Sequence, residues 1–221
     1  GHVLFLFVFG ALAAVRRRSR KLRAVAACAI AVTVTALPAN AADFDGRYIR
    51  VTGDQINNTA EALGILRGTA APRTFVEDIR GKVAAIDFGG GAGTFPDTVP
   101  YLDGTADELK DDFLQQMTGL VTIPAGEWTI GFGSDDGGTV IIPGVAFSER
   151  YNATAGTDDH ETRFNGTRGH GWTMGEFTLD APLTTQFEAV FFERGGGDSF
   201  EVAILDGLAG ANDPTDFEIL A

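Results

Sequence analysis

The sequence contains a single cysteine, Cys28, which lies in an apolar stretch near the start of the chain. Residues 42–221 therefore contain no disulfide and no thiolate nucleophile. They are also poor in basic side chains. Six of the seventeen Lys and Arg precede residue 42, which leaves eleven against thirty Asp and Glu and a net charge of −19. Because such a charge repels nucleic acid and anionic membranes, neither is expected as a partner.

Two catalytic motifs are absent as well. None of Ser134, Ser148 and Ser199 stands in a G-x-S-x-G motif, and the chain has no His-Glu-x-x-His pair for zinc. The many carboxylates leave a glycoside hydrolase open as an alternative, since such enzymes use two acids about 5 to 10 Å apart. We nevertheless expect a protein that is not an enzyme.

Residues 1–41 have the features of a secretory signal peptide. They contain no acidic side chain, and their basic cluster at residues 16–23 is followed by the apolar run Ala24–Leu37. Ala39-Asn40-Ala41 then predicts cleavage after Ala41. We therefore expect a secreted, extracellular protein with a bacterial-type export signal, and no membrane insertion of the mature form.

Short apolar runs recur along the mature chain, each bounded by Gly, Pro, Asp or Asn. In one run Phe187, Ala189 and Phe191 alternate with Glu188 and Val190, so one face of that strand belongs to a core. Many short strands separated by turn signals indicate an all-β fold, an antiparallel β-sandwich of the jelly-roll type. The predicted strands are Tyr48–Val51, Val83–Phe88, Trp128–Phe132, Val140–Ile142, Phe177–Leu179, Phe187–Phe192 and Phe200–Ile204.

One short helix is expected near the mature N-terminus, at about Thr59–Arg67. Asn58 or Thr59 would cap its start, and Gly68 follows its last turn. The stretch Ala106–Gly119 is ambiguous, because its apolar residues fit the spacing of a helix and of a strand equally well.

An acidic, glycine-rich segment between two apolar runs is the most informative part of the chain. Within Glu127–Gly144, alternating runs flank Ser134–Gly138, a pattern that predicts a strand, an acidic loop and a second strand. The adjacent carboxylates of Asp135 and Asp136 are hard oxygen ligands of the kind that Ca²⁺ prefers. In the alternative interpretation, the two aspartates only accept hydrogen bonds from the backbone amides of a turn.

The order of these motifs resembles the fourteen-kilodalton protective-antigen domain, a lectin-like β-sandwich of secreted proteins and flocculin-type adhesins. The similarity covers roughly residues 83–205. It implies that Phe113–Ile123 is a strand, and that Asp135 and Asp136 are joined by a cis peptide and bind one Ca²⁺ that holds sugar hydroxyls. The motifs that carry it are Asp111-Asp112-Phe113, Gly119–Gly126, Trp128–Phe132, Ser134–Gly138, Gly175–Leu179, Phe187–Glu193 and Gly195–Val202.

Two aspartates do not complete a calcium site, because Ca²⁺ takes six to eight oxygens. Loop position and chemistry make Asp198, in a glycine-rich loop, and Asn165, in the polar insertion Val145–Trp172, the best further ligands. Trp172 is a candidate to stack on a sugar ring, with closure of a core edge as the alternative.

These observations divide the chain into four parts and suggest one function. We expect a non-catalytic module for calcium-assisted binding of carbohydrate or a glycosylated cell surface. The alternative is a structural or adhesive surface protein without a ligand site. The parts are a signal peptide at 1–41, with 1–14 untranslated if the start codon lies near Val15, a strand and helix packed on the sandwich at 42–82, the sandwich itself at 83–205, and a tail at 206–221.

Overall fold

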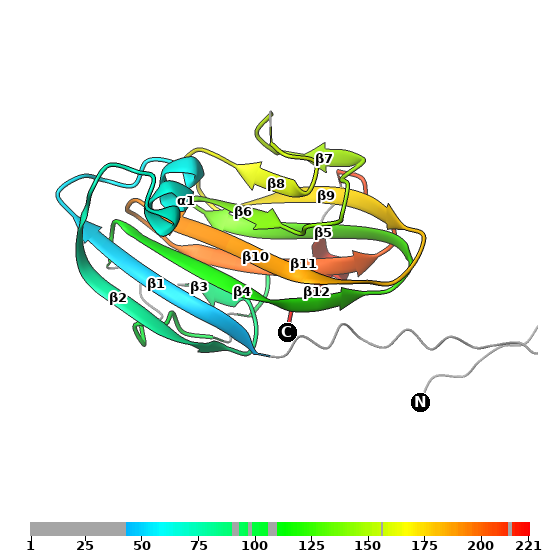
Figure 1. The fold of residues 1–221 in the computed structure, drawn as a ribbon, viewed down its shortest axis with the longest axis horizontal. Coiled ribbons are helices and arrows are strands. Elements are labelled where there is room, and N and C mark those ends of the chain that lie inside the picture. Colours follow the sequence, from blue (N-terminus) through cyan, green and yellow to red (C-terminus); the bar gives the residue numbers. More distant parts are fainter. Residues whose placement is uncertain (1–42, 90–92, 97–98, 106–109, 156, 212–213) are drawn as a thin grey trace, which may run out of the picture. The chain divides into compact units, whose positions relative to one another are not determined.

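The structure of the protein is a computed structural model that describes residues 43–89, 93–96, 99–105, 110–155, 157–211 and 214–221. These residues form two antiparallel β-sheets, with one short α-helix, α1, lying against one of them (Figure 1). The expected all-β sandwich is therefore confirmed. The predicted signal peptide lies outside the described residues.

Strands distant in sequence are neighbours in both sheets. The first sheet contains, in spatial order, β2 (Thr74–Val83), β1 (Phe44–Thr52), β4 (Phe113–Ile123), β10 (Leu183–Glu193), β6 (Gly137–Ile141) and β8 (Glu161–Phe164). The second contains β12 (Glu218–Ile219), β11 (Ser199–Asp206), β5 (Gly126–Asp135), β9 (Gly171–Leu179) and β7 (Glu149–Tyr151), and β3 (Asp87–Gly89) pairs with β11. A 3-10 helix, η1 (Pro214–Asp216), precedes β12.

The main core lies between the two sheets and is rich in phenylalanine. On β10, the alternating residues Phe187, Ala189 and Phe191 are all buried in this core, as expected from their spacing. The Phe191 ring stacks on that of Phe200 from β11, with centroids 5.2 Å apart and an angle of 13° between the planes. Each such buried side chain contributes about 2 kcal/mol to stability.

A second core explains why β10 is apolar on both faces. Val190 and Phe192 point away from the main core and pack under α1 (Thr59–Arg67). Asn58 caps the helix by accepting the Glu61 N–H at 2.9 Å, and Gly68 ends it in the left-handed conformation, with φ of 67°. The predicted helix and both of its ends are therefore confirmed.

Within the ambiguous stretch Ala106–Gly119, residues 113–119 form a strand, and residues 106–109 lie outside the described part of the chain. Phe113 begins β4, which pairs with β1 and β10, so its alternating residues face the two cores. The predicted strand Val83–Phe88 was wrong as a single unit. Val83 ends β2 in the first sheet and Asp87 begins β3 in the second, because the chain crosses between the sheets at residues 84–86.

The acidic segment is not a hairpin of two paired strands. β5 belongs to the second sheet and β6 to the first, and Asp136 is the only residue between them. Both strands were predicted. They do not pair with each other as the strands of a hairpin do, because each pairs with other strands of its own sheet. The carboxylates therefore lie where the chain passes from one layer to the other.

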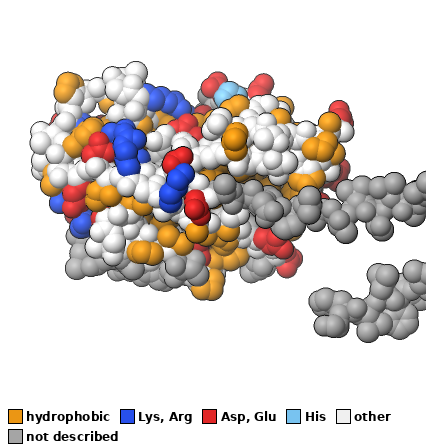
Figure 2. Space-filling model, turned by 60° about the horizontal axis from the view of Figure 1, so that its bottom comes forward, with side chains coloured by type: hydrophobic (Ala, Val, Ile, Leu, Met, Phe, Trp, Pro, Cys, Tyr) orange, Lys and Arg blue, Asp and Glu red, His pale blue; other side chains and the backbone are white. Residues whose placement is uncertain are grey.

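Charged side chains on the strands of the first sheet pair with one another. Lys82 lies 2.8 Å from Asp45, and Arg47 forms two hydrogen bonds of 2.8 Å with Asp78. Figure 2 likewise shows basic and acidic side chains next to each other on one face of the molecule, with no large patch of either sign. Within the described residues, no helix has the length and apolar character needed to cross a bilayer.

Candidate functional site

Three carboxylates come together where β5 passes into β6. The peptide bond between Asp135 and Asp136 is cis. Oxygen atoms of Asp135, Asp136 and Glu193 lie within 4.8 Å of one another, which makes this group a candidate site for a metal ion. Asp136 and Glu193 are buried, whereas Asp135 is partly exposed. We call these three residues the carboxylate cluster.

Glycine at position 137 allows a second segment to approach the cluster closely. A Cβ atom on Gly137 would lie 2.5 Å from the Gly166 carbonyl oxygen and 2.9 Å from that of Phe164. The loop that follows β8 therefore passes directly over the start of β6. This close approach brings the backbone of Arg168 to the carboxylate of Asp136.

Two backbone amides fix the orientation of the Asp136 side chain. The Arg168 N–H donates to Oδ1 and the Arg194 N–H donates to Oδ2, both at 3.0 Å. These bonds lower the pKa of Asp136, but burial is the larger effect and the net pKa is raised. The loops after β8 and β10 thus meet at a single carboxylate.

The Arg168 side chain supports the cluster from the protein interior. Its guanidinium donates to the Ser134 backbone oxygen at 3.2 Å, to Ser134 Oγ at 2.9 Å and to Thr173 Oγ1 at 3.0 Å. It also lies over the Phe164 ring, 4.1 Å from the centroid. Ser134 Oγ in turn donates to the Asp136 carbonyl oxygen at 3.0 Å, so Arg168 holds both sides of the cis peptide in place.

Glu193 has a carboxylate oxygen that nothing in the described part of the chain satisfies. Its side chain is 1% exposed, and Oε1 accepts the Gly195 N–H at 2.5 Å. Oε2 is buried and has no hydrogen-bond partner among the described residues. A buried carboxylate oxygen without a partner is costly, and a cation held between the three side chains would satisfy it.

The electrostatics of the cluster favour a cation. Burial, together with the charge of Asp136, raises the pKa of Glu193 to about 9 and that of Asp135 to about 6. Both residues therefore hold protons more tightly than ordinary carboxylates do, because like charges crowd a desolvated site. A divalent cation would replace those protons and relieve the repulsion.

The raised pKa values predict how stability varies with pH when calcium is absent. Between the ordinary carboxyl pKa and about 9, the folded state keeps a proton on Glu193 that the unfolded chain has released. The free energy of unfolding should therefore decrease as pH rises from about 5 to 9, and the decrease should be smaller in Glu193→Gln. Denaturant titrations across this range would show it, and equal slopes in the two proteins would contradict the assignment.

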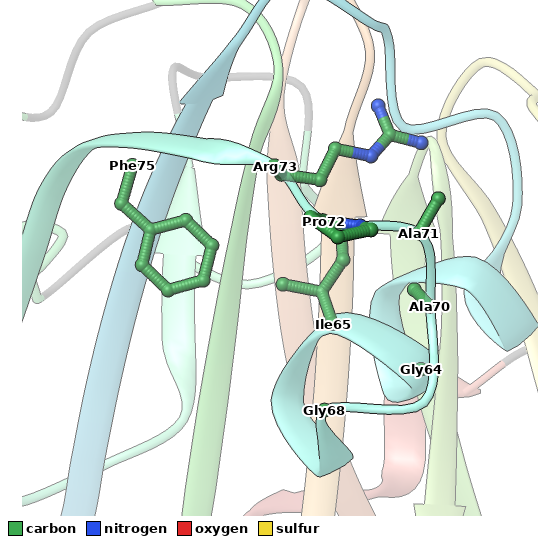
Figure 3. Close-up of a pocket in the computed structure, with 8 residues that line it drawn as sticks. All are labelled: Gly64, Ile65, Gly68, Ala70, Ala71, Pro72, Arg73 and Phe75. Atoms are coloured by element: carbon green, nitrogen blue, oxygen red, sulfur yellow. The ribbon is translucent and has the colours of Figure 1, made fainter.

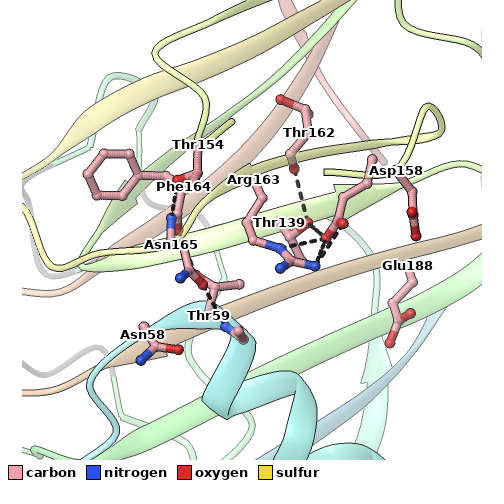
Figure 4. A network of polar contacts seen from close by, with 12 residues as sticks. Asn58, Thr59, Thr139, Thr154, Asp158, Thr162, Arg163, Phe164, Asn165 and Glu188 are labelled. Carbon is pink, nitrogen blue, oxygen red and sulfur yellow. Dashed lines mark hydrogen bonds and ion pairs between the residues drawn. The ribbon is translucent and has the colours of Figure 1, made fainter. Parts of the chain in front are cut away.

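The two other predicted calcium ligands, Asp198 and Asn165, lie outside the carboxylate cluster. Asp198 is buried just before β11, and its negative charge contributes to the raised pKa of Glu193, although Asp198 is outside the carboxylate cluster. The amide oxygen of Asn165 accepts the Ala60 N–H at 2.8 Å, at the first turn of α1 (Figure 4). Asn165 thus connects the loop after β8 to the helix.

Trp172 packs on the outer face of the second sheet, away from the main core. Its ring contacts those of Phe95 and Phe217, with centroids 5.9 Å and 6.3 Å apart. The indole N–H donates to Thr94 Oγ1 at 2.9 Å. Trp172 is therefore partly buried against a separate apolar cluster on this outer face.

A pocket elsewhere on the surface does not involve these carboxylates. It has a volume of about 240 Å³ and lies between the C-terminal half of α1 and Phe75 (Figure 3). Its lining is apolar except for Arg73, whose guanidinium donates to Glu61. We therefore place the candidate site at the carboxylate cluster.

Comparisons with known proteins connect the fold to solved structures. No protein-family model matches the sequence, and no curated protein does. A PA14 sugar-binding domain from an RTX adhesin has 22% identity and a TM-score of 0.51, covering 80% of this chain and 94% of that one. The PA14 domain of the antifreeze protein MpAFP has 16% identity and a TM-score of 0.52, covering 80% and 86%. The chain therefore has the β-sandwich fold of these PA14 domains.

Proposed function

We propose that the protein is a non-catalytic carbohydrate-binding module in which Ca²⁺, held by Asp135, Asp136 and Glu193, orients hydroxyl groups of a sugar. The observation that carries this proposal is the buried Oε2 of Glu193, which lies beside two further carboxylates and has no hydrogen-bond partner among the described residues. Carboxylate oxygens are the ligands that Ca²⁺ prefers, and the remaining coordination positions would go to backbone oxygens, water and sugar hydroxyls.

Two further observations support the proposal. One structural neighbour is described as a sugar-binding domain and comes from an adhesin, so this fold supports sugar binding in another protein. Asp136 and Glu193 are 5% and 1% exposed. Desolvated carboxylates so close together need a counter-ion, which supports a bound cation at this site. A secreted adhesive module fits the predicted signal peptide and the acidic composition of the mature chain.

Calcium should stabilise the wild-type protein and should be required for sugar binding. At about 100 times its Kd, calcium would add about 2.7 kcal/mol, which corresponds to about 5 to 10 °C in Tm for a domain of this size. The measurement is thermal unfolding in chelator and in calcium chloride, followed by a glycan array in both buffers.

A double variant and a matched control separate specific from general effects of the ion. Asp135→Asn/Asp136→Asn should lose the calcium shift and the calcium-dependent glycan signal. Asp180→Asn, which changes an exposed carboxylate just beyond the far end of β9, should keep both. A calcium shift without any glycan signal would favour the structural surface protein, and no calcium shift in the wild type would rule out the metal site.

A further inference from the structure

Arg194 stands beside the carboxylate cluster, yet no residue that the structure describes engages its side chain. It follows Glu193 directly, and its backbone N–H donates to Asp136 Oδ2 at 3.0 Å. Of the eleven Lys and Arg in the described part of the chain, the side chains of nine form a hydrogen bond or an ion pair within it, and those of Arg80 and Arg194 do not.

Arg194 lies next to the carboxylate cluster in the sequence, and its side chain is accessible to solvent. Burial raises the pKa of Asp136 and of Asp112, and the positive charge of Arg194 partly offsets this rise at both carboxylates. No carboxylate of the described residues lies within 4.0 Å of the Arg194 guanidinium. The side chain is partly exposed, and the next two residues, Gly195 and Gly196, are exposed and carry no side chain to cover it. No described residue occupies its hydrogen-bond donors, and a ligand at the cluster could therefore accept from them.

We propose that Arg194 selects sugars that carry a carboxylate or sulfate group, by pairing with that group while the bound ion holds neighbouring hydroxyls. This inference rests on the proposed calcium-dependent function and adds the class of sugar. A guanidinium is suited to this role, because its planar fork of N–H donors matches two oxygens of a carboxylate or sulfate.

The local charge balance makes anion binding depend on the ion. Four carboxylates, those of Asp135, Asp136, Glu193 and Asp198, and two guanidinium groups, those of Arg168 and Arg194, belong to the site or to residues next to it. A divalent cation bound by the ionised carboxylates brings the sum of these charges to zero. An anionic sugar would then meet no net repulsion and would gain the interaction with Arg194.

The test compares glycan binding by three variants on an array that carries neutral, uronic-acid, sialic-acid and sulfated glycans, in calcium chloride. Arg194→Gln should bind the preferred anionic glycan at least about tenfold more weakly than the wild type. Arg194→Lys keeps the positive charge but loses the planar fork of donors. Its affinity for the anionic glycan should lie between those of the wild type and Arg194→Gln. Arg80→Gln is the matched control, since it removes another unengaged arginine, exposed on β2, and should bind like the wild type.

The outcomes separate this inference from the function on which it rests. Calcium should raise the Tm of Arg194→Gln as much as that of the wild type, because Arg194 supports the metal ligands only through its backbone N–H. Binding of neutral glycans alone, or equal binding of anionic glycans by Arg194→Gln and wild type, would overturn the role of Arg194 and leave the proposed function intact. Absence of all glycan binding in calcium would overturn both. The array also distinguishes carboxylate from sulfate recognition.

Discussion

Replacing Arg168 with Gln should lower the free energy of unfolding by about 3 kcal/mol or more and abolish the effect of calcium. The guanidinium makes three hydrogen bonds, to the two oxygens of Ser134 and to Thr173, and it stacks on Phe164. Charge-assisted hydrogen bonds of this kind contribute about 1.5 to 3 kcal/mol each, and a cation over an aromatic ring adds about 1 kcal/mol. The shorter Gln side chain reaches few of these partners. Denaturant unfolding with and without calcium measures both effects.

A surface arginine provides the control for this experiment. Arg67 has a side chain that is 52% exposed, and its ion pair with Glu188 is 3.4 Å long. Because exposed ion pairs contribute less than about 1 kcal/mol, Arg67→Gln should leave stability and the calcium response nearly unchanged. A calcium shift of normal size in Arg168→Gln would show that the cluster does not need Arg168 to hold its shape.

Gly137→Ala should also cause a large loss of stability, of about 3 kcal/mol. The added methyl group would lie 2.5 Å from the Gly166 carbonyl oxygen and 2.6 Å from Cε1 of Phe192. One of these atoms is backbone and the other belongs to a ring in the second core, so neither can move without disturbing its neighbours. Thermal and denaturant unfolding would measure the loss, and the calcium response should weaken with it.

A second glycine in the same loop region gives a matched comparison. An added Cβ at Gly169 meets no atom within 4 Å, and its φ lies outside the left-handed region. Gly169→Ala should therefore change the free energy of unfolding by less than about 0.5 kcal/mol. Equal effects of the two substitutions would mean that the loop after β8 does not pack against β6 as described.

The fold was predictable where the sequence pattern is local. Alternation in Phe187–Phe192 and the caps at Asn58 and Gly68 depend on neighbouring residues, and the structure confirms them. The resemblance resolved Phe113–Ile123 where periodicity did not. β2 was missed because it is an edge strand whose residues are mostly exposed, and a strand of that kind has no clear apolar alternation.

The site was predictable only in part, because its residues come from distant segments. Asp135 and Asp136 stand out as neighbours in the sequence, whereas Glu193 lies 57 residues further along and becomes their neighbour through the topology of the first sheet. The alternation of this strand does predict the direction of the Glu193 side chain. Glu193 continues the inward-facing series Phe187, Ala189, Phe191, so its carboxylate is expected to point into the sandwich at the end of that strand. Asn165 has the right chemistry for a ligand, but the helix start takes up its amide oxygen.

The strands that supply the three carboxylates belong to different layers. Asp135 ends a strand of the second sheet, and Glu193 ends a strand of the first. A calcium ion bound between these strands would cross-link the two sheets at one edge. Sliding one layer over the other would then require breaking metal–oxygen bonds as well as apolar contacts. The resistance of this domain to mechanical shear would consequently follow the concentration of dissolved calcium around it.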